Sequence, residues 1–218
     1  MKISMIPLNL RIKKDSQRKI AEVQDIIVSE LYEVFNKAVF HGGTAIWRCF
    51  QGKRFSEDLD FYLPRNKEKI ELLFKNLEQK GFKINKKKIS ENSLYSELEI
   101  NRTKVRLEAT YQNKTMIIQD YETITGSKIS IYSLSAEEFI REKIATYQKR
   151  LKVRDLYDIF FLLKEINPAN IKELNKLIQE FKYPQDEEDL KTIILEGIVP
   201  TSKEMFEYIK SKWESANI

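Results

Sequence analysis

The spacing of apolar residues along the chain predicts two amphipathic helices in the N-terminal third. The first is predicted over residues 16–37, where apolar side chains recur every three or four positions and so form one buried stripe. Its members are Ile20, Val23, Ile27, Leu31, Val34 and Ala38. The second helix is predicted over residues 66–80, with Gly81 as its C-terminal stop. Its inward positions are Ile70, Leu73, Phe74 and Leu77.

The segment between these two helices is predicted to hold two short strands and one short helix. The apolar stretch at residues 39–41 ends at Gly42-Gly43, which breaks the strand. Thr44 is then expected to serve as the N-cap of a short helix. Residues 58–63 alternate between polar and apolar side chains, as a half-buried strand does, and Pro64 ends that strand.

After Gly81 the pattern changes first to strands and then to helices. Short segments separated by polar turns predict strands near residues 82–84, 94–100, 105–111, 115–119 and 129–131. Ser135, with Glu138 three residues later, is a capping signature that begins a helix. That helix is expected to end near residue 149, and helices follow at about 154–165, 170–181, 186–196 and 202–214. The pattern predicts an α+β fold, with a mixed sheet and flanking helices in residues 1–134 and a C-terminal helical bundle in residues 135–218.

Composition excludes several kinds of site. Among 218 residues there is one cysteine, Cys49, and one histidine, His41, so an intramolecular disulfide and a zinc site built from cysteines or several histidines are excluded. The net charge of +5 is compatible with an anionic partner such as a nucleotide or RNA. Its excess lies in the middle third, where Lys86-Lys87-Lys88 is interpreted as a solvated run, with RNA contact as the alternative. Residues 1–7 lack a signal-peptide core and no long apolar run is present, so a soluble, cytoplasmic protein without membrane contact is expected.

The most informative chemistry lies between the Gly-Gly turn and the following strand. Two glycines at a strand end, followed by a helix start, let backbone N–H groups approach an anion closely. Asp58 and Asp60 are two positions apart on the predicted strand, so their carboxylates share one face. Two adjacent like charges are usually tolerated because a cation lies between them, and oxygen-only ligands suit Mg²⁺ or Mn²⁺. The alternative is that both aspartates simply form the solvated face of an edge strand.

The same residues resemble a known family. Gly42-Gly43-Thr44, a spacer, and then Arg54-Phe55-Ser56-Glu57-Asp58-Leu59-Asp60-Phe61 resemble the nucleotidyltransferase superfamily that includes DNA polymerase beta, and more narrowly its AbiEii branch. That branch contains the toxins of type IV toxin–antitoxin systems, and the MenT nucleotidyltransferases are its relatives. The resemblance implies a nucleotidyltransferase-like sheet. It also implies that the aspartates bind the metals that carry a nucleoside triphosphate. The expected nucleotide-binding residues are Gly42, Gly43, Thr44, Arg54, Ser56 and Lys143.

A second motif, further along the chain, supports the narrower resemblance. The predicted helix after Ser135 contains Glu142-Lys143-Ile144-Ala145, and the next helix contains Arg154-Asp155-Leu156-Tyr157-Asp158. The resemblance implies that Lys143 reaches the triphosphate and that Asp155 completes the polar cluster, so that residues 135–218 complete the active-site cleft. The alternative is a solvated helix face in which Arg154 pairs with Asp158.

Two features depart from the general superfamily pattern. The spacer between Gly43 and Asp58 is at the long end of that pattern. The third metal-binding carboxylate of such sites lies on a later strand, where Glu108 is the best-placed candidate, although Glu108 could equally pair with Arg106.

The function implied by the resemblance is metal-dependent transfer of a nucleoside monophosphate from a nucleoside triphosphate to an acceptor hydroxyl. The catalytic residues are expected to be Asp58, Asp60, Lys143 and Asp155, with Asp58, Asp60 and Glu108 as the metal ligands. The expected acceptor is a tRNA or another RNA, and the expected partner is a cognate antitoxin protein. Two alternatives remain: a nucleotidyltransferase that modifies a small molecule, and a non-catalytic protein that only binds nucleotide.

Overall fold

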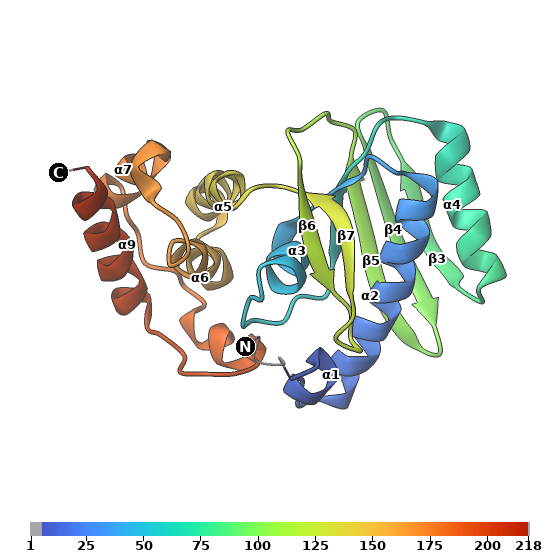
Figure 1. Ribbon diagram of the computed structural model, residues 1–218, viewed down its shortest axis with the longest axis horizontal. Coiled ribbons are helices and arrows are strands. Elements are labelled where there is room, and N and C mark those ends of the chain that lie inside the picture. Colours follow the sequence, from blue (N-terminus) through green and yellow to red (C-terminus); the bar gives the residue numbers. More distant parts are fainter. Residues whose placement is uncertain (1–5, 218) are drawn as a thin grey trace. The chain divides into compact units, whose positions relative to one another are not determined.

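The computed structural model describes residues 6–217 and divides the chain into two compact units (Figure 1). The first unit comprises residues 1–51 and 55–134, and the second comprises Gly52–Arg54 and Ser135–Ile218. Residues 1–5, most of the segment expected to lack a signal-peptide core, lie outside the described residues. Within residues 6–217, every helix is too short or too polar to cross a membrane.

A seven-stranded mixed sheet forms the centre of the first unit, with the strand order β3-β4-β5-β2-β1-β7-β6. The strands pair antiparallel except for β2 with β5 and β1 with β7, which are parallel. Their bounds are Val39–His41 (β1), Leu59–Tyr62 (β2), Lys83–Ile89 (β3), Ser93–Ile100 (β4), Thr103–Thr110 (β5), Ile117–Glu122 (β6) and Lys128–Ser133 (β7).

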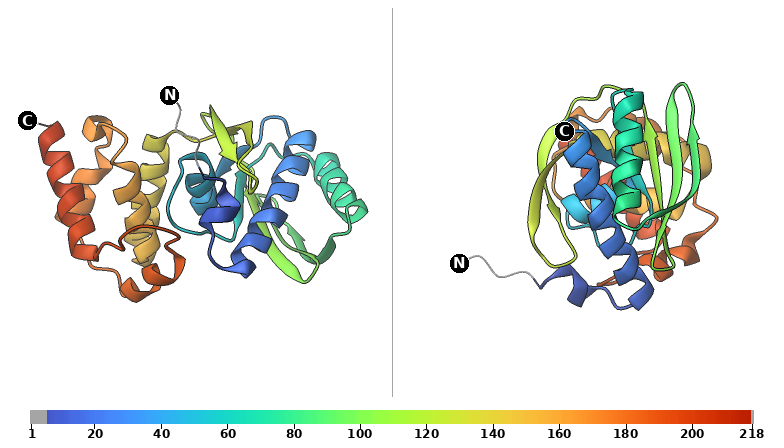
Figure 2. Two further views of the ribbon diagram at one scale, coloured as in Figure 1. Left: turned by 60° about the horizontal axis from the view of Figure 1, so that its bottom comes forward. Right: turned by 90° about the vertical axis from the view of Figure 1, so that its right-hand side faces the viewer.

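The apolar stripes predicted from the sequence face this sheet. The helices of the first unit are α1 (Leu8–Arg11), α2 (Asp15–Val34), α3 (Gly42–Cys49) and α4 (Lys67–Gln79). Figure 2 shows α2 and α4 side by side across the sheet. The predicted inward residues of α4 are all buried, and so are Val23, Ile27 and Leu31 of α2. Burial of this apolar surface is the main stabilising contribution to such a layered unit.

The two faces of the sheet differ because side chains alternate along each strand. On β5, Val105, Leu107 and Ala109 are buried, whereas Arg106 is exposed and Glu108 is partly exposed. Leu59 and Phe61 of β2 are likewise buried on the helix-covered side. The polar residues of β5 and β2 therefore share the opposite face of the sheet.

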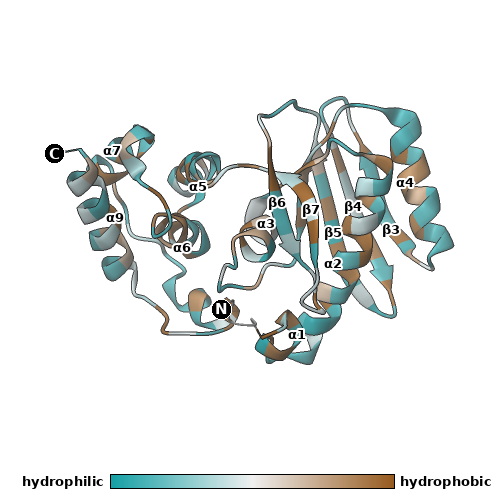
Figure 3. Cartoon of the chain, in the orientation of Figure 1, coloured by the Kyte–Doolittle hydropathy of each residue, from teal (hydrophilic) through white to brown (hydrophobic). Residues whose placement is uncertain are grey.

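The lysine run predicted as a solvated segment belongs to the edge strand β3, which Figure 3 shows as largely hydrophilic. Charged residues on an edge strand disfavour pairing with a second chain. Lys87 points toward α4, where its ammonium lies 2.7 Å from a carboxylate oxygen of Glu71 and 4.3 Å from the ring centre of Phe74.

The second unit is helical. It contains α5 (Ala136–Arg150), α6 (Val153–Leu162), the 3₁₀ turn Pro168–Asn170, α7 (Glu173–Gln179), the 3₁₀ turn Glu187–Asp189, α8 (Leu190–Ile193) and α9 (Ser202–Ala216). The pairs α5–α6, α6–α9, α5–α7 and α7–α9 are in contact. Ser135 caps α5 as predicted, because its hydroxyl accepts a hydrogen bond from the Glu138 backbone N–H.

Two local predictions were wrong. Thr44 is not an N-cap, because α3 begins two residues earlier at Gly42 and its N-cap is His41. The Thr44 hydroxyl instead donates a hydrogen bond to the carbonyl of Asp58. The single helix expected at 186–196 is a 3₁₀ turn followed by the short helix α8, after which residue 194 has an extended backbone and forms an isolated β-bridge with residue 54.

Candidate active site

Three of the predicted carboxylates lie together on the polar face of the sheet. Strands β2 and β5 are parallel, and their register sets Asp60 directly beside Glu108. Asp58 immediately precedes β2, so strand alternation places it on the same face as Asp60. Burial raises the pKa of the Glu108 carboxyl, and the neighbouring charges of Asp60 and Asp58 raise it further, while Arg106 lowers it. The arrangement is a cluster of like charges that favours a bound cation.

Arg106 already supplies one positive charge to this cluster. Its Nε donates to Asp58 Oδ1 at 2.7 Å and its Nη2 donates to Asp58 Oδ2 at 2.5 Å, which is a two-pronged ion pair. The hydrogen bonds to Asp58 raise the pKa of Arg106 against the opposing effect of partial burial. The Arg106 side chain is 48% exposed and that of Asp58 is 25% exposed, so the pair is open to solvent.

Gly42 packs directly against Asp60, which explains why the turn after β1 needs glycine. Its φ is +76°, a backbone conformation that other residues rarely adopt. A Cβ atom built at Gly42 would lie 2.1 Å from Asp60 Oδ2 and 2.9 Å from Asp60 Cβ, which real structures do not tolerate. Helix α3 starts at this residue. The first backbone N–H groups of the helix therefore lie beside the Asp60 carboxylate.

Backbone carbonyls leading into Asp58 are held by side chains from two helices. Gln24 of α2 is fully buried, and its amide nitrogen donates to the carbonyls of Ser56 at 3.0 Å and Glu57 at 2.9 Å. Thr44 of α3 donates to the carbonyl of Asp58 at 2.5 Å. Gln24 was not predicted from the sequence, although a polar residue among the buried positions of α2 was the available signal.

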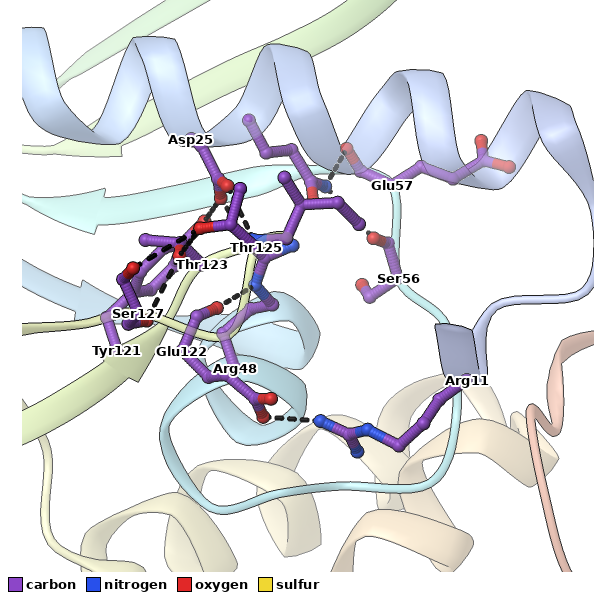
Figure 4. Close-up of polar contacts among 12 residues, drawn as sticks. Arg11, Asp25, Arg48, Ser56, Glu57, Tyr121, Glu122, Thr123, Thr125 and Ser127 are labelled. Carbon is purple, nitrogen blue, oxygen red and sulfur yellow. Dashed lines mark hydrogen bonds and ion pairs between the residues drawn. The ribbon is translucent and has the colours of Figure 1, made fainter. Parts of the chain in front are cut away.

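A buried arginine, Arg48, ties α3 to α2 and β6 (Figure 4). Arg48 forms an ion pair with Asp25, and its Nε donates to the carbonyl of Glu122 at 2.7 Å. The guanidinium carbon lies 4.6 Å from the ring centre of Tyr121, whose hydroxyl also donates to Asp25. Burial raises the pKa of the Asp25 carboxyl, with Arg48 opposing that effect. Arg48 therefore helps to fix the helix that begins at the Gly-Gly turn.

Three further predicted residues, Arg54, Lys143 and Asp155, belong to a buried ion-pair cluster within the second unit. Lys143 of α5 lies 2.7 Å from Asp158 Oδ2 and 3.4 Å from Asp155 Oδ1, and both aspartates belong to α6. Arg54, in the Gly52–Arg54 segment of that unit, donates to both Asp158 oxygens at 2.6 Å. Arg150 donates to both oxygens of Asp155.

These ion pairs exclude one of the two interpretations of the second motif, the solvated helix face. Arg54, Lys143, Asp155 and Asp158 are all buried, so the motif is not a solvated helix face, and Asp158 pairs with Arg54 and Lys143. Burial alone opposes ionisation of Asp158, but the positive charges of Arg54 and Lys143 and their hydrogen bonds hold its pKa below the usual value.

The carboxylate cluster has the donor chemistry of a site for a hard divalent cation. Asp58, Asp60 and Glu108 offer only oxygen atoms, which suit Mg²⁺ or Mn²⁺. Within residues 6–217, no three histidine, cysteine, aspartate or glutamate side chains are spaced to hold a metal ion together. Both oxygens of Asp58 are bonded to Arg106 instead. Asp58, Asp60 and Glu108 therefore have the ligand chemistry for such a metal but not the spacing in this arrangement, and Asp58 would have to leave Arg106 to bind one.

Comparison with known proteins decides the family. Residues 26–207 match the family described as "Nucleotidyl transferase AbiEii toxin, Type IV TA system". This chain belongs to the AbiEii nucleotidyltransferase toxin family. The match extends over both units and includes the Gly-Gly turn, the Asp58–Asp60 motif and the Lys143 motif. The sequence-based resemblance is confirmed, and the AbiEii family makes the chain a nucleotidyltransferase whose substrate is a nucleotide and whose partner is an antitoxin.

Solved structures show the same fold at low sequence identity. JHP933 from Helicobacter pylori aligns with a TM-score of 0.60 and 17% identity, covering 90% of this chain and 91% of JHP933. A protein from H. pylori described as a candidate nucleotidyltransferase aligns with a TM-score of 0.56 and 17% identity, covering 90% of this chain and 94% of that one. No curated protein matches the sequence. The α+β fold predicted for this AbiEii chain is therefore confirmed.

Proposed function

We propose that this AbiEii protein transfers a nucleoside monophosphate from a nucleoside triphosphate to an acceptor hydroxyl of an RNA, such as a tRNA, with release of pyrophosphate. The observation that carries the proposal is the meeting of Asp58, Asp60 and Glu108 on one face of the sheet, beside the glycine turn that begins α3. Clustered carboxylates next to the N–H groups of a helix start suit a metal-bound triphosphate.

In this proposal all three carboxylates hold the metal, and one of them also accepts a proton. Asp58 and Asp60 would hold Mg²⁺ or Mn²⁺, and Glu108 would be the third ligand. When bound, the cation would neutralise triphosphate charge and lower the pKa of the acceptor hydroxyl. Asp60 or Glu108 accepts the proton of that hydroxyl, which then attacks the α-phosphorus as pyrophosphate leaves. Positioning and charge stabilisation supply most of the rate enhancement in such a transfer.

The phosphate-binding groups are proposed from both motifs. The backbone N–H groups of Gly43 and Thr44 lie in the first turn of α3, at the positive end of the helix dipole. Ser56 adds a hydroxyl close to Asp58 in the chain, and Lys143 adds an ammonium group. Arg54 and Asp155 serve this reaction by holding the Lys143 cluster together, which their buried ion pairs support. These roles rest on the family resemblance and on the contacts within each unit.

An RNA acceptor and an inhibitory outcome are proposed on separate grounds, the charge of the chain and its family. The chain has a net charge of +5 and a pI of about 9.0, which favours a polyanionic partner. The AbiEii family comprises the toxins of type IV toxin–antitoxin systems. Transfer of a nucleotide to a functional RNA would block that RNA, and the antitoxin would counter the effect. A small-molecule acceptor is the competing outcome of the experiment below.

The test is incubation with each of the four α-labelled nucleoside triphosphates, Mg²⁺ and total cellular RNA. We expect labelled RNA, and we expect Asp58→Asn and Asp60→Asn to lower transfer by about two to three orders of magnitude, as removal of one charge-stabilising group does. Both variants keep the shape of the side chain, so their melting temperatures should stay close to that of the parent. Label found only in small molecules would contradict the RNA acceptor, and full activity in EDTA would contradict the metal mechanism.

A further inference from the structure

We propose that Arg106 exchanges its bond with Asp58 for a bond with the triphosphate when the metal-bound nucleotide arrives. The inference rests on the proposed function and gives that reaction an additional substrate-binding residue. In this view Arg106 balances the charge of Asp58 while the site holds no substrate, and its release makes metal and nucleotide binding depend on each other. Arg106 is thus a substrate-binding residue as well as the ion-pair partner of Asp58.

The geometry places Arg106 at the position where a cation is needed. Leu107 of β5 pairs with Leu59 of β2, so Arg106 and Asp58 are side by side, each one residue earlier on its strand. The guanidinium bonds to both oxygens of Asp58, at 2.7 and 2.5 Å. A divalent cation that used those oxygens would lie within a few ångströms of the guanidinium charge, which would repel it. Metal binding to Asp58 therefore requires Arg106 to move.

Arg106 is able to move because its side chain is 48% exposed, so the guanidinium can leave Asp58 toward solvent. Water screens so exposed an ion pair, which lowers the free energy needed to separate its two charges. A guanidinium also binds phosphate in the same two-pronged way that it binds carboxylate. Binding of metal alone leaves Arg106 without its partner, whereas binding of metal with a triphosphate supplies a new one. The structure thus favours joint binding of metal and nucleotide over binding of metal alone.

The experiment measures binding, not turnover. Free Mn²⁺ is followed by electron paramagnetic resonance during titration of the full chain, first alone and then with a non-hydrolysable nucleoside triphosphate analogue. For Arg106→Ala we expect Mn²⁺ alone to bind at least about fivefold more tightly. We expect the Mn²⁺–analogue complex to bind at least about fivefold more weakly, since about fivefold is the lower end of ordinary coupling between two ligands.

Two further variants give the controls. Lys104→Ala removes a cation from the same face of β5, where Lys104 lies 3.4 Å from Glu97, and both affinities should stay at the parental values. Arg106→Lys keeps the charge without the planar fork, so Mn²⁺ alone should bind much as in the parent while the analogue binds more weakly. Melting curves are recorded for each variant, and because Arg106 and Lys104 are exposed, all variants should fold.

In Arg106→Ala the affinity for Mn²⁺ alone must rise and the affinity for the Mn²⁺–analogue complex must fall. Mn²⁺ binding that is unchanged or weaker without nucleotide, or analogue binding that is unchanged, would overturn the proposal. If the parent transfers nucleotide to RNA in either of those cases, only the role of Arg106 is refuted. If no variant binds Mn²⁺ and the parent transfers nothing, the proposed function is refuted together with the role of Arg106.

Discussion

At Gly42 the backbone has a φ of +76°, and the Asp60 carboxylate lies where a side chain would begin. The residue is therefore constrained twice, once by its own conformation and once by a neighbour with a proposed catalytic part. Asp58 has a comparable double constraint, since Arg106 holds its oxygens and Thr44 holds its carbonyl. These contacts between individual atoms hold Asp58 and Asp60 in the carboxylate cluster.

Gly42→Ala should damage the site more than its backbone strain alone implies. The left-handed conformation costs a residue with a side chain about 1–3 kcal/mol, and the new Cβ must also displace the Asp60 carboxylate. We expect transfer to fall by at least about two orders of magnitude, as on loss of one charge-stabilising group, measured with labelled nucleotide.

The matched control for that variant is Gly81→Ala in the same unit. Gly81 has a φ of +92°, but a Cβ there would meet only Ile100 Cδ1 at 3.9 Å, which is an ordinary contact. Gly81→Ala should also lose stability through backbone strain, while its rate of nucleotide transfer stays near that of the parent. Equal loss of activity in both variants would show that Gly42 acts through strain alone.

Asp158 makes the stability of the second unit depend on pH. Its folded pKa is below the ordinary value near 3.8, because Arg54 and Lys143 outweigh burial. The stabilisation is therefore fully present above about pH 3.8 and is lost as the pH falls through the lower folded pKa. Asp158→Asn leaves two buried cations without that charge and should cost about 3–5 kcal/mol at neutral pH.

Urea unfolding of the parent and of Asp158→Asn between pH 7 and pH 2 measures this effect. The difference in unfolding free energy should shrink only at the acid end of the range. Asp120→Asn is the control, because Asp120 pairs with Lys128 on an exposed surface, and its removal should have little effect at any pH. A constant difference between the parent and Asp158→Asn down to pH 2 would contradict the ion-pair explanation.

At the scale of elements, helices α2 and α3 act as a frame for the segment that enters β2. Gln24 of α2 donates to two consecutive carbonyls, and Thr44 of α3 donates to the third. Arg48 joins the same two helices through Asp25. The end of the long spacer between the Gly-Gly turn and Asp58 is thus held by Gln24 of α2, which precedes the spacer, and by Thr44 of α3, which lies within it.

Gln24→Leu should lower transfer while the chain stays folded. The change leaves the Ser56 and Glu57 carbonyls without their donor and should cost about 1–3 kcal/mol. Because these carbonyls lead into Asp58, we expect the affinity for Mn²⁺ with a nucleotide analogue to fall as well. Gln17→Leu, near the start of the same helix, is the control and should leave that affinity unchanged. Normal affinity in Gln24→Leu would mean that the amide has only a structural role.

At the scale of the whole molecule, the aspartates of the first motif and the Lys143 motif lie in different compact units, and Arg54 of the first motif belongs to the second unit. Asp58, Asp60 and Glu108 belong to the first unit, whereas Lys143 and Asp155 belong to the second. The Gly52–Arg54 segment of the second unit interrupts the first, and three chain connections therefore join the two units. An AbiEii-type reaction that uses both motifs depends on the full chain.

Lys143→Ala should weaken nucleotide binding without unfolding the chain. Asp158 keeps Arg54 and Asp155 keeps Arg150 as partners in this variant, so neither carboxylate is left without a cation. A triphosphate analogue with Mg²⁺ at 100 times its dissociation constant should stabilise the parent by about 2.7 kcal/mol. We expect a much smaller melting shift in Lys143→Ala and partial recovery in Lys143→Arg. An undiminished shift would assign Lys143 to the buried ion-pair cluster alone, and exposed Lys149→Ala is the control.

The sequence by itself determined the elements and the family of this protein. Helical stripes, alternating strands, the Gly-Gly turn and the Asp58–Asp60 spacing are local patterns, because each depends on residues a few positions apart. They predicted the α+β fold, which the comparison with solved structures confirms, and the AbiEii resemblance, which the family match confirms. The metal ligands and the RNA acceptor stay predictions.

Only the tertiary structure decided which distant residues meet. Arg106 pairs with Asp58 because β5 lies beside β2, although β3 and β4 separate these strands in the sequence. Arg54 and Asp158 are 104 positions apart and still form a buried ion pair. Such pairings have no periodic signal, since they depend on strand order and on the packing of whole elements. The sequence pattern therefore supplied the carboxylates, and the fold decided which cations lie beside them.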